Sequence, residues 1–165
     1  MALDYSTRNR LYILSLHDYG EDDLLIEEMR GREGVSQLFE FHLRIQSSRD
    51  DIDPRRIIGK PAILRIQNHE GDEGEEARHW NGCVSRFVQC GRHASPDGED
   101  IWVYECDIVP WFWFMTQQED CRIFQNKTVP EIVETIFAEF QYDDFKMELT
   151  GEHPSLEYCT QYHET

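Results

Sequence analysis

The chain has 165 residues, which is enough for one ordinary domain with an apolar core. Its 33 acidic and 16 basic residues give a net charge of −17, and this balance disfavours nucleic-acid binding because phosphates must be neutralised by Lys and Arg. Proteins, cations or basic surfaces are the partners that such a charge favours. The longest uncharged apolar run, residues 108–115, is too short to span a bilayer, so we expect no membrane insertion.

The first ten residues lack the apolar run and cleavage site of a signal peptide, which predicts synthesis and residence in the cytosol. The cysteines form an odd set without a CxxC pair, and this argues against a disulfide framework. We expect reduced, mostly packed thiols at Cys83, Cys90, Cys106, Cys121 and Cys159.

The first half of the chain carries strand patterns. Two apolar runs, residues 11–16 and 24–29, flank an acidic turn and predict a β-hairpin. In residues 38–45, positions 39 to 45 alternate between apolar and polar side chains, which indicates a strand with one face in the core. The apolar positions of this strand are Phe39, Phe41, Leu43 and Ile45.

The middle of the chain predicts a second pair of strands. Asp53 and Pro54 open a short helical turn over residues 55–58, after which residues 62–66 form a strand. Its antiparallel mate is predicted over residues 80–88, beyond an acidic, glycine-containing loop. The even positions of that mate, which share a face, are Trp80, Val84 and Val88.

The last third becomes less regular. Residues 101–109 predict another strand, and the aromatic and polar stretch that follows Pro110 predicts a helical turn. Thr128 and Glu131 form a capping-box pattern before an amphipathic helix that ends near Phe140 and packs one face on the sheet. Residues 145–149 are a final strand candidate.

These elements predict a mainly β fold with one late α-helix. Six or seven strands joined by successive hairpins favour an antiparallel barrel or sandwich over a parallel βαβ sheet. Closure into a barrel would also remove exposed strand edges.

One set of residues has the ligand types of a zinc site, namely His79, Cys83, Cys90 and His93. If residues 80–90 form one strand, Cys83 and Cys90 lie on opposite faces and about 23 Å apart, at about 3.3 Å per residue. A tetrahedral site holds its sulfur ligands about 2.3 Å from one ion, so this geometry argues against zinc.

Other catalytic and cofactor patterns are missing from the sequence. The acidic loop 68–76 lacks the spacing of a calcium loop, and a solvated hairpin tip is the better interpretation. The sequence has no nucleophile elbow, no phosphate-binding glycine loop and no HExxH motif. We therefore predict no catalytic, cofactor-binding or metal-binding residues, and no enzyme activity.

The aromatic segment from Trp111 to Phe114 leaves alternatives open. Core packing is the first interpretation, followed by a protein-contact surface and then by a sugar-stacking platform. The main alternative function is accordingly a carbohydrate- or small-ligand-binding β-barrel that uses Trp111 and Trp113. A hydrolase is a second alternative, and it would need two carboxylates facing each other at about 5–10 Å.

Several fragments in a fixed order resemble the N-terminal hub region of the valine-glycine repeat protein G family. This family forms the type VI secretion spike and is related to the baseplate hub of contractile phage tails. The fragments cover nearly the whole chain. They are Gly31–Gly34 with Ser36 and Leu38–Phe41; Gly59–Ala62; Gly82, Val84 and Phe87; Pro110 and Trp111; Cys121–Gln125 and Lys127–Ile132; and Glu157–Cys159 with Gln161, Tyr162 and Glu164.

The resemblance implies a structural part rather than a catalyst. It implies a phage-tail-hub β-barrel over residues 1–125, followed by residues 126–165 as a helix and the start of a second, truncated hub subdomain. The full-length protein would be a trimer that docks onto the hexameric tube and contacts baseplate, effector or adaptor proteins. It would stay in the cytoplasm until loaded and then be secreted through the type VI apparatus.

The chain departs from the family pattern in two ways. The second barrel, the oligonucleotide/oligosaccharide-binding-like domain and the needle of the family are absent, so the isolated chain is expected to lack the contacts that drive trimerisation. The acidic insertion at residues 71–76 and the strong negative charge are not family features. Three copies would bring together a charge of about −51, three times −17, so we expect self-repulsion to weaken assembly at low salt.

Overall fold

The structure is a computed structural model that describes residues 6–7, 10–67, 78–140 and 145–165. The chain divides into two compact units, Met1–Pro110 and Trp111–Thr165, and each is described by itself. This division by contacts falls before the boundary predicted between residues 125 and 126. The assignment of residues 1–125 and 126–165 to two hub domains remains a prediction.

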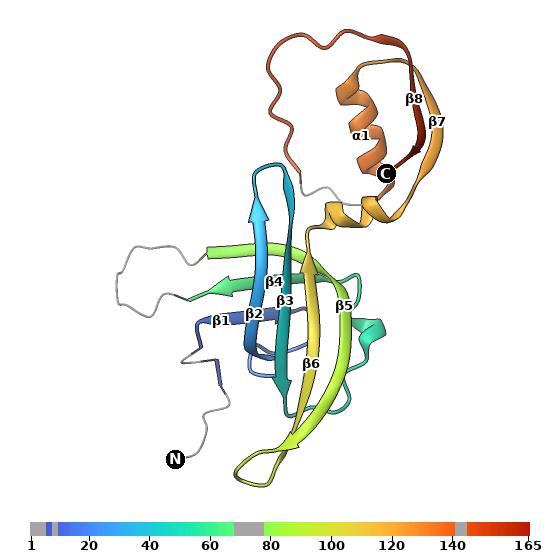
Figure 1. Cartoon of the computed structure of the whole chain (residues 1–165). Coiled ribbons are helices and arrows are strands. Elements are labelled where there is room, and N and C mark those ends of the chain that lie inside the picture. The colour runs from blue at the N-terminus through green and yellow to red at the C-terminus, as the bar shows by residue number, and fades with distance from the viewer. Residues whose placement is uncertain (1–5, 8–9, 68–77, 141–144) are drawn as a thin grey trace. The chain divides into compact units, whose positions relative to one another are not determined.

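The first unit is a six-stranded antiparallel sheet in the order β1-β4-β5-β6-β3-β2 (Figure 1). Its long strands bend, so that the sheet curls in the manner of a half-barrel. The strand bounds are β1 Tyr12–Leu16, β2 Leu25–Gly34, β3 Gln37–Ser47, β4 Pro61–Ile66, β5 Arg78–Ala94 and β6 Asp100–Val109. A short 3-10 helix, η2 at Pro54–Arg56, precedes β4, and Asp53 is its N-cap, in agreement with the helical turn predicted from Asp53 and Pro54.

The strand pairings confirm one sequence prediction and correct another. β4 and β5 are antiparallel partners as predicted, with Ala62 opposite Gly82. The predicted hairpin between the first two strands is wrong, because β1 pairs with β4 and β2 pairs with β3. The reason is that β2 continues beyond the predicted run 24–29 to Gly34, and a tight turn then joins it directly to β3, which gives both strands a long ladder.

The core lies on the inner face of the curled sheet. The alternation predicted for β3 is confirmed, since Phe41, Leu43 and Ile45 are all buried. Phe87 and Tyr104 stack with their ring centroids 5.2 Å apart. The hydroxyl of Tyr104 donates a 2.8 Å hydrogen bond to the carbonyl oxygen of Arg49, which satisfies the one polar atom of this buried ring.

A β-bulge in β5 corrects the predicted face of Val88. Val84 lies opposite Ile108, but the register shifts before Arg86, which lies opposite Asp107. The extra residue reverses the alternation, so Phe87 turns into the core and Val88 is 40% exposed.

The second unit combines a two-stranded antiparallel sheet with one helix. A 3-10 helix, η3 at Trp111–Gln117, confirms the predicted helical turn, and α1 at Val129–Glu139 confirms the predicted amphipathic helix. The strands are β7 at Asp120–Lys127 and β8 at Leu156–Glu164, and the sequence analysis predicted neither of them. The strand predicted over residues 145–149 is wrong, because this segment has no regular structure.

The apolar side chain at Phe145 accounts for that error. The centroid of its ring lies 4.8 Å from that of Phe137 on α1. The apolar character of this position therefore reflects a contact between two aromatic rings and does not indicate a strand. Within the described ranges, no helix combines the length and the apolar character needed to cross a membrane.

The capping box of α1 allows a first prediction. The Thr128 hydroxyl accepts a hydrogen bond from the backbone N–H of Glu131, and the Glu131 carboxylate accepts one of 2.7 Å from the backbone N–H of Thr128. Thr128→Ala is expected to destabilise the helix by about 1 kcal/mol, which corresponds to amide hydrogen exchange in α1 about five times faster. Thr128→Ser keeps the cap and is expected to exchange as the wild type does; equal exchange in the alanine variant would contradict the prediction.

Candidate functional site: a charge-paired outer face

The outer face of four neighbouring strands carries an ordered set of charges, here called the outer face. It is formed by β2, β3, β6 and β5, whose polar positions alternate with the core positions described above. In one row, Arg44 of β3 lies between Glu28 and Glu105. In the next row, His42 lies between Arg30 and Asp107. Opposite charges therefore meet across the strands in the first row, and along β2, where Arg30 pairs with Glu28.

Ion pairs connect these rows. The Arg44 Nε atom is 2.9 Å from a carboxylate oxygen of Glu27, and Arg86 Nη2 is 2.8 Å from one of Glu105. His42 Nδ1 contacts the carboxylate of Asp107. The hydrogen bond from Arg86 lowers the pKa of the Glu105 carboxyl below its ordinary value, so this group stays charged. Single exposed pairs contribute little stability, but a network fixes the positions of the charges.

The outer face is nearly neutral even though the chain is strongly acidic. It carries five carboxylates and four guanidinium groups, a net charge of −1 when His42 is neutral, while the whole chain carries −17. Almost all of the excess negative charge therefore lies elsewhere. The charged residues of the face are Glu27, Glu28, Arg30, Arg32, Glu40, Arg44, Arg86, Glu105 and Asp107.

The turn between β2 and β3 presents an apolar residue to solvent. Val35 is 96% exposed, and Ser36 has a φ of 56°, in the left-handed region that a tight hairpin turn requires. A fully exposed valine at the tip of a hairpin gains nothing from the fold itself. Single exposed apolar side chains are common on protein surfaces, so Val35 alone does not mark an interface.

The four residues considered for zinc do not come together. Cys83 is buried and Cys90 is exposed, while His79 lies opposite Arg65 and His93 lies opposite Ile101. In the part of the chain that the structure describes, no group of three or more His, Cys, Asp or Glu side chains could hold a metal ion. The acidic loop considered for calcium lies outside the described residues.

The thiols of Cys90 on β5 and Cys106 on β6 are not activated. Burial raises the pKa of the Cys106 thiol well above its ordinary value, and desolvation followed by the charge of Glu105 raises that of Cys90. A raised pKa leaves the thiol protonated near neutral pH, whereas a nucleophilic cysteine needs the thiolate.

The aromatic segment after Pro110 belongs to a ring cluster in the second unit. The Trp111 ring lies 5.3 Å from that of Phe137, edge to face, and 6.5 Å from that of Phe145. Phe112 also contacts Phe137, at 5.6 Å. These rings pack on one another, but none of them is fully buried, since Phe112 is 40% exposed and Phe145 is 39% exposed. Core packing, the first interpretation offered above, therefore stays a prediction for this segment.

The sequence analysis missed the outer face as a unit. The signal was present, because Glu40, His42 and Arg44 are the polar positions of the alternating strand, and Glu105 and Asp107 alternate likewise. Only the strand order and register bring these residues side by side. Such a juxtaposition of charges comes from the pairing of strands far apart in sequence.

The curled antiparallel sheet with its charge-paired outer face makes the first unit a mainly β domain. Residues 32–165 match the phage tail baseplate hub (GPD) family. Since this match covers most of the chain, the protein belongs to that family.

Curated relatives come from Pseudomonas aeruginosa. The type VI secretion system spike protein VgrG1a is 36% identical over 146 residues, which cover 88% of this chain and 21% of the relative. The spike protein VgrG1b is 34% identical over 146 residues, which cover 88% of this chain and 18% of the relative. The chain thus spans about a fifth of the length of the curated relatives it matches.

A solved structure shows the same fold. The E. coli c3393 protein, described as a component of the type VI secretion system with structural similarity to the T4 bacteriophage tail proteins gp27 and gp5, superposes with a TM-score of 0.65. The match has 24% sequence identity and covers 95% of this chain and 38% of that chain. The predicted fold class, antiparallel β of the phage tail hub type, is confirmed by this likeness and by the family match.

Proposed function

We propose that the chain is a structural part of the hub of a type VI secretion spike. The observation that carries the proposal is the 36% identity to a spike protein across 88% of the chain. In this role the domain docks onto the hexameric tube beneath the spike and helps to deliver effectors. It stays in the cytoplasm until it is loaded, and it leaves the cell through the secretion apparatus.

The proposed mechanism is assembly by shape and many contacts, without catalysis. Large interfaces gain their energy from distributed apolar contacts and hydrogen bonds around a few central residues. The outer face supports this role, because a surface of fixed, alternating charges selects partners with the complementary order. Its near-neutral charge also lets other proteins approach without the repulsion expected from the chain as a whole.

The proposed partners follow from the same role. In the full-length protein we place this chain in a trimer, where its strand edges and loops face the neighbouring subunits. The tube protein lies on one side, and baseplate, effector or adaptor proteins complete the contacts.

Secretion of the tube protein tests the function. In a host with a single spike gene, deletion of the gene that encodes the full-length protein is expected to abolish release of the tube protein, and a plasmid copy is expected to restore it. The measurement is the tube protein in culture supernatant against that in cells. Unchanged release in the deletion strain would overturn the proposal.

Two full-length variants test the outer face. Arg86→Glu places a third negative charge beside Glu105 and Asp107, and it is expected to lower tube-protein release by about tenfold, because like charges destroy the ordered pattern. Arg92→Glu is the control, since Arg92 pairs with Asp100 near the far end of the same strand and lies outside the outer face. Release lowered equally by both variants, at equal cellular protein levels, would contradict a specific role of the face.

A further inference from the structure

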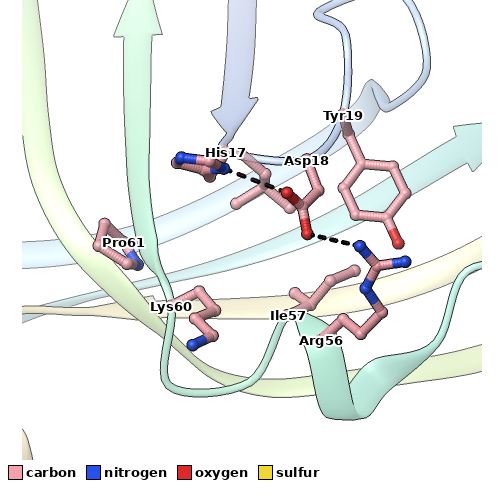
Figure 2. Close-up of a pocket in the computed structure, with 8 residues that line it drawn as sticks. His17, Asp18, Tyr19, Arg56, Ile57, Lys60 and Pro61 are labelled. Carbon is pink, nitrogen blue, oxygen red and sulfur yellow. Dashed lines mark hydrogen bonds and ion pairs between the residues drawn. The ribbon is translucent and has the colours of Figure 1, made fainter.

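A cavity of about 360 Å³ lies at the end of β1, where the turn after Leu16 meets the segment that joins η2 to β4 (Figure 2). Leu16, Ile57 and Pro61 give it an apolar lining, and the ring of Tyr19 stands at one side. Its size falls within the range of small-ligand sites, which combine apolar walls with a few polar groups.

The cavity holds more positive than negative charge. Arg56 and Lys60 line it together with the single carboxylate of Asp18. Two groups already hold that carboxylate, since Arg56 Nη2 and His17 Nδ1 are each 3.1 Å from one of its oxygens. The hydrogen bond from His17, followed by the charge of Arg56, lowers the pKa of Asp18, so it stays ionised near neutral pH. With His17 neutral, the site carries a net charge of +1.

Lys60 is the unusual member of this group. The Lys127 ammonium donates to the Thr135 hydroxyl, and Lys146 forms an ion pair with Glu148. The Lys60 ammonium has no ion pair or hydrogen bond with any residue in the described ranges, although the chain carries twice as many acidic as basic residues. Arg56 also has N–H donors left over, because a guanidinium offers five and one goes to Asp18.

We infer that this cavity binds a carboxylate carried on a short aliphatic group. The Lys60 ammonium and the remaining N–H groups of Arg56 would hold the carboxylate, and Leu16, Ile57 and Pro61 would cover the aliphatic part. A single negative charge matches the net charge of the site, whereas a phosphate dianion would exceed it. The C-terminal residue of a polypeptide and a free short-chain carboxylic acid share this chemistry. The inference stands independently of the secretion role.

Titration of the 165-residue chain with defined probes tests the inference, with backbone amide NMR shifts as the readout. The probes are acetyl-alanyl-leucine with a free carboxylate, the same dipeptide as its amide, and 4-methylpentanoate. We expect the free acid to shift the amides of Leu16, Ile57 and Lys60, and the amide form to bind at least about tenfold more weakly, the equivalent of about 1.4 kcal/mol. Tighter binding of the peptide acid identifies a chain terminus as the source, and tighter binding of 4-methylpentanoate identifies the free acid.

Two charge-removing variants locate the site. Lys60→Gln is expected to weaken binding of the preferred probe by about tenfold. Lys146→Gln removes the same charge from a lysine in the other unit and is expected to bind as the wild type does. Unchanged thermal unfolding midpoints would show that both variants fold. The inference is overturned if neither acid shifts these amides up to about 10 mM, if the amide form binds equally well, or if the two variants lose affinity equally.

Discussion

Leu64→Ala is expected to lower the free energy of unfolding of the first unit by about 3 kcal/mol. Leu64 is completely buried at the centre of β4, opposite Leu14 on β1 and Trp80 on β5. Its truncation removes apolar contacts from three strands and leaves a cavity that the sheet cannot close without breaking its ladders. Urea unfolding followed by circular dichroism measures the change.

The neighbouring residue provides the control. Ile63 occupies the adjacent position of β4, but its side chain is 43% exposed. Ile63→Ala deletes a similar number of methyl and methylene groups from the other face and is expected to cost less than about 1 kcal/mol. Equal losses in the two variants would contradict the assignment of the faces.

Gly82→Ala is expected to cost about 2–3 kcal/mol, because the added methyl group has no room. A Cβ at Gly82 would lie 2.6 Å from the carbonyl oxygen of Val109 and 2.9 Å from a methyl carbon of Ile108. The carbonyl belongs to the β6 backbone, so relief requires the β5–β6 ladder to shift. This close approach is a physical reason for glycine at the start of the Gly82-x-Val84 fragment.

The same strand contains the matched control for this substitution. A Cβ at Gly91 would meet nothing within 4 Å. Gly91→Ala is expected to leave stability unchanged or to raise it by up to about 1 kcal/mol, because alanine has fewer unfolded conformations to lose. The difference between the urea unfolding midpoints of the two variants measures the effect of the steric clash at Gly82. Equal midpoints would contradict the prediction, because they would show that β5 and β6 move apart at little cost.

Local patterns predicted a large part of this fold. The period of two in β3 identified its buried face, and the Thr128–Glu131 pattern located the start of α1. Asp53 and Pro54 likewise marked η2. In each case the physical cause lies within a few residues of the feature, as a cap, a turn or an alternation. Such causes are visible in one sequence.

The errors arose where the cause is distant. The acidic turn after Leu16 suggested a hairpin, but the partner of β1 is β4, far along the chain. The bulge before Arg86 changes which side chains of β5 point into the core, and the residue types at that position do not predict a bulge. β7 and β8 were missed because each is a mixed polar and apolar segment whose strand character depends on the other. The outer face depends on the same long-range pairing.

The alternation of charges on the outer face also has a consequence for how related sequences diverge. Arg44 has carboxylates beside it on both neighbouring strands, so reversal of its charge alone would leave like charges side by side. We expect substitutions here to be tolerated mainly as compensated pairs, with residues 27, 44 and 105 covarying across three strands. Two hubs that diverge in this way would keep the same net charge on the outer face. They would still recognise different surfaces, because positive and negative positions on the three strands would have changed places.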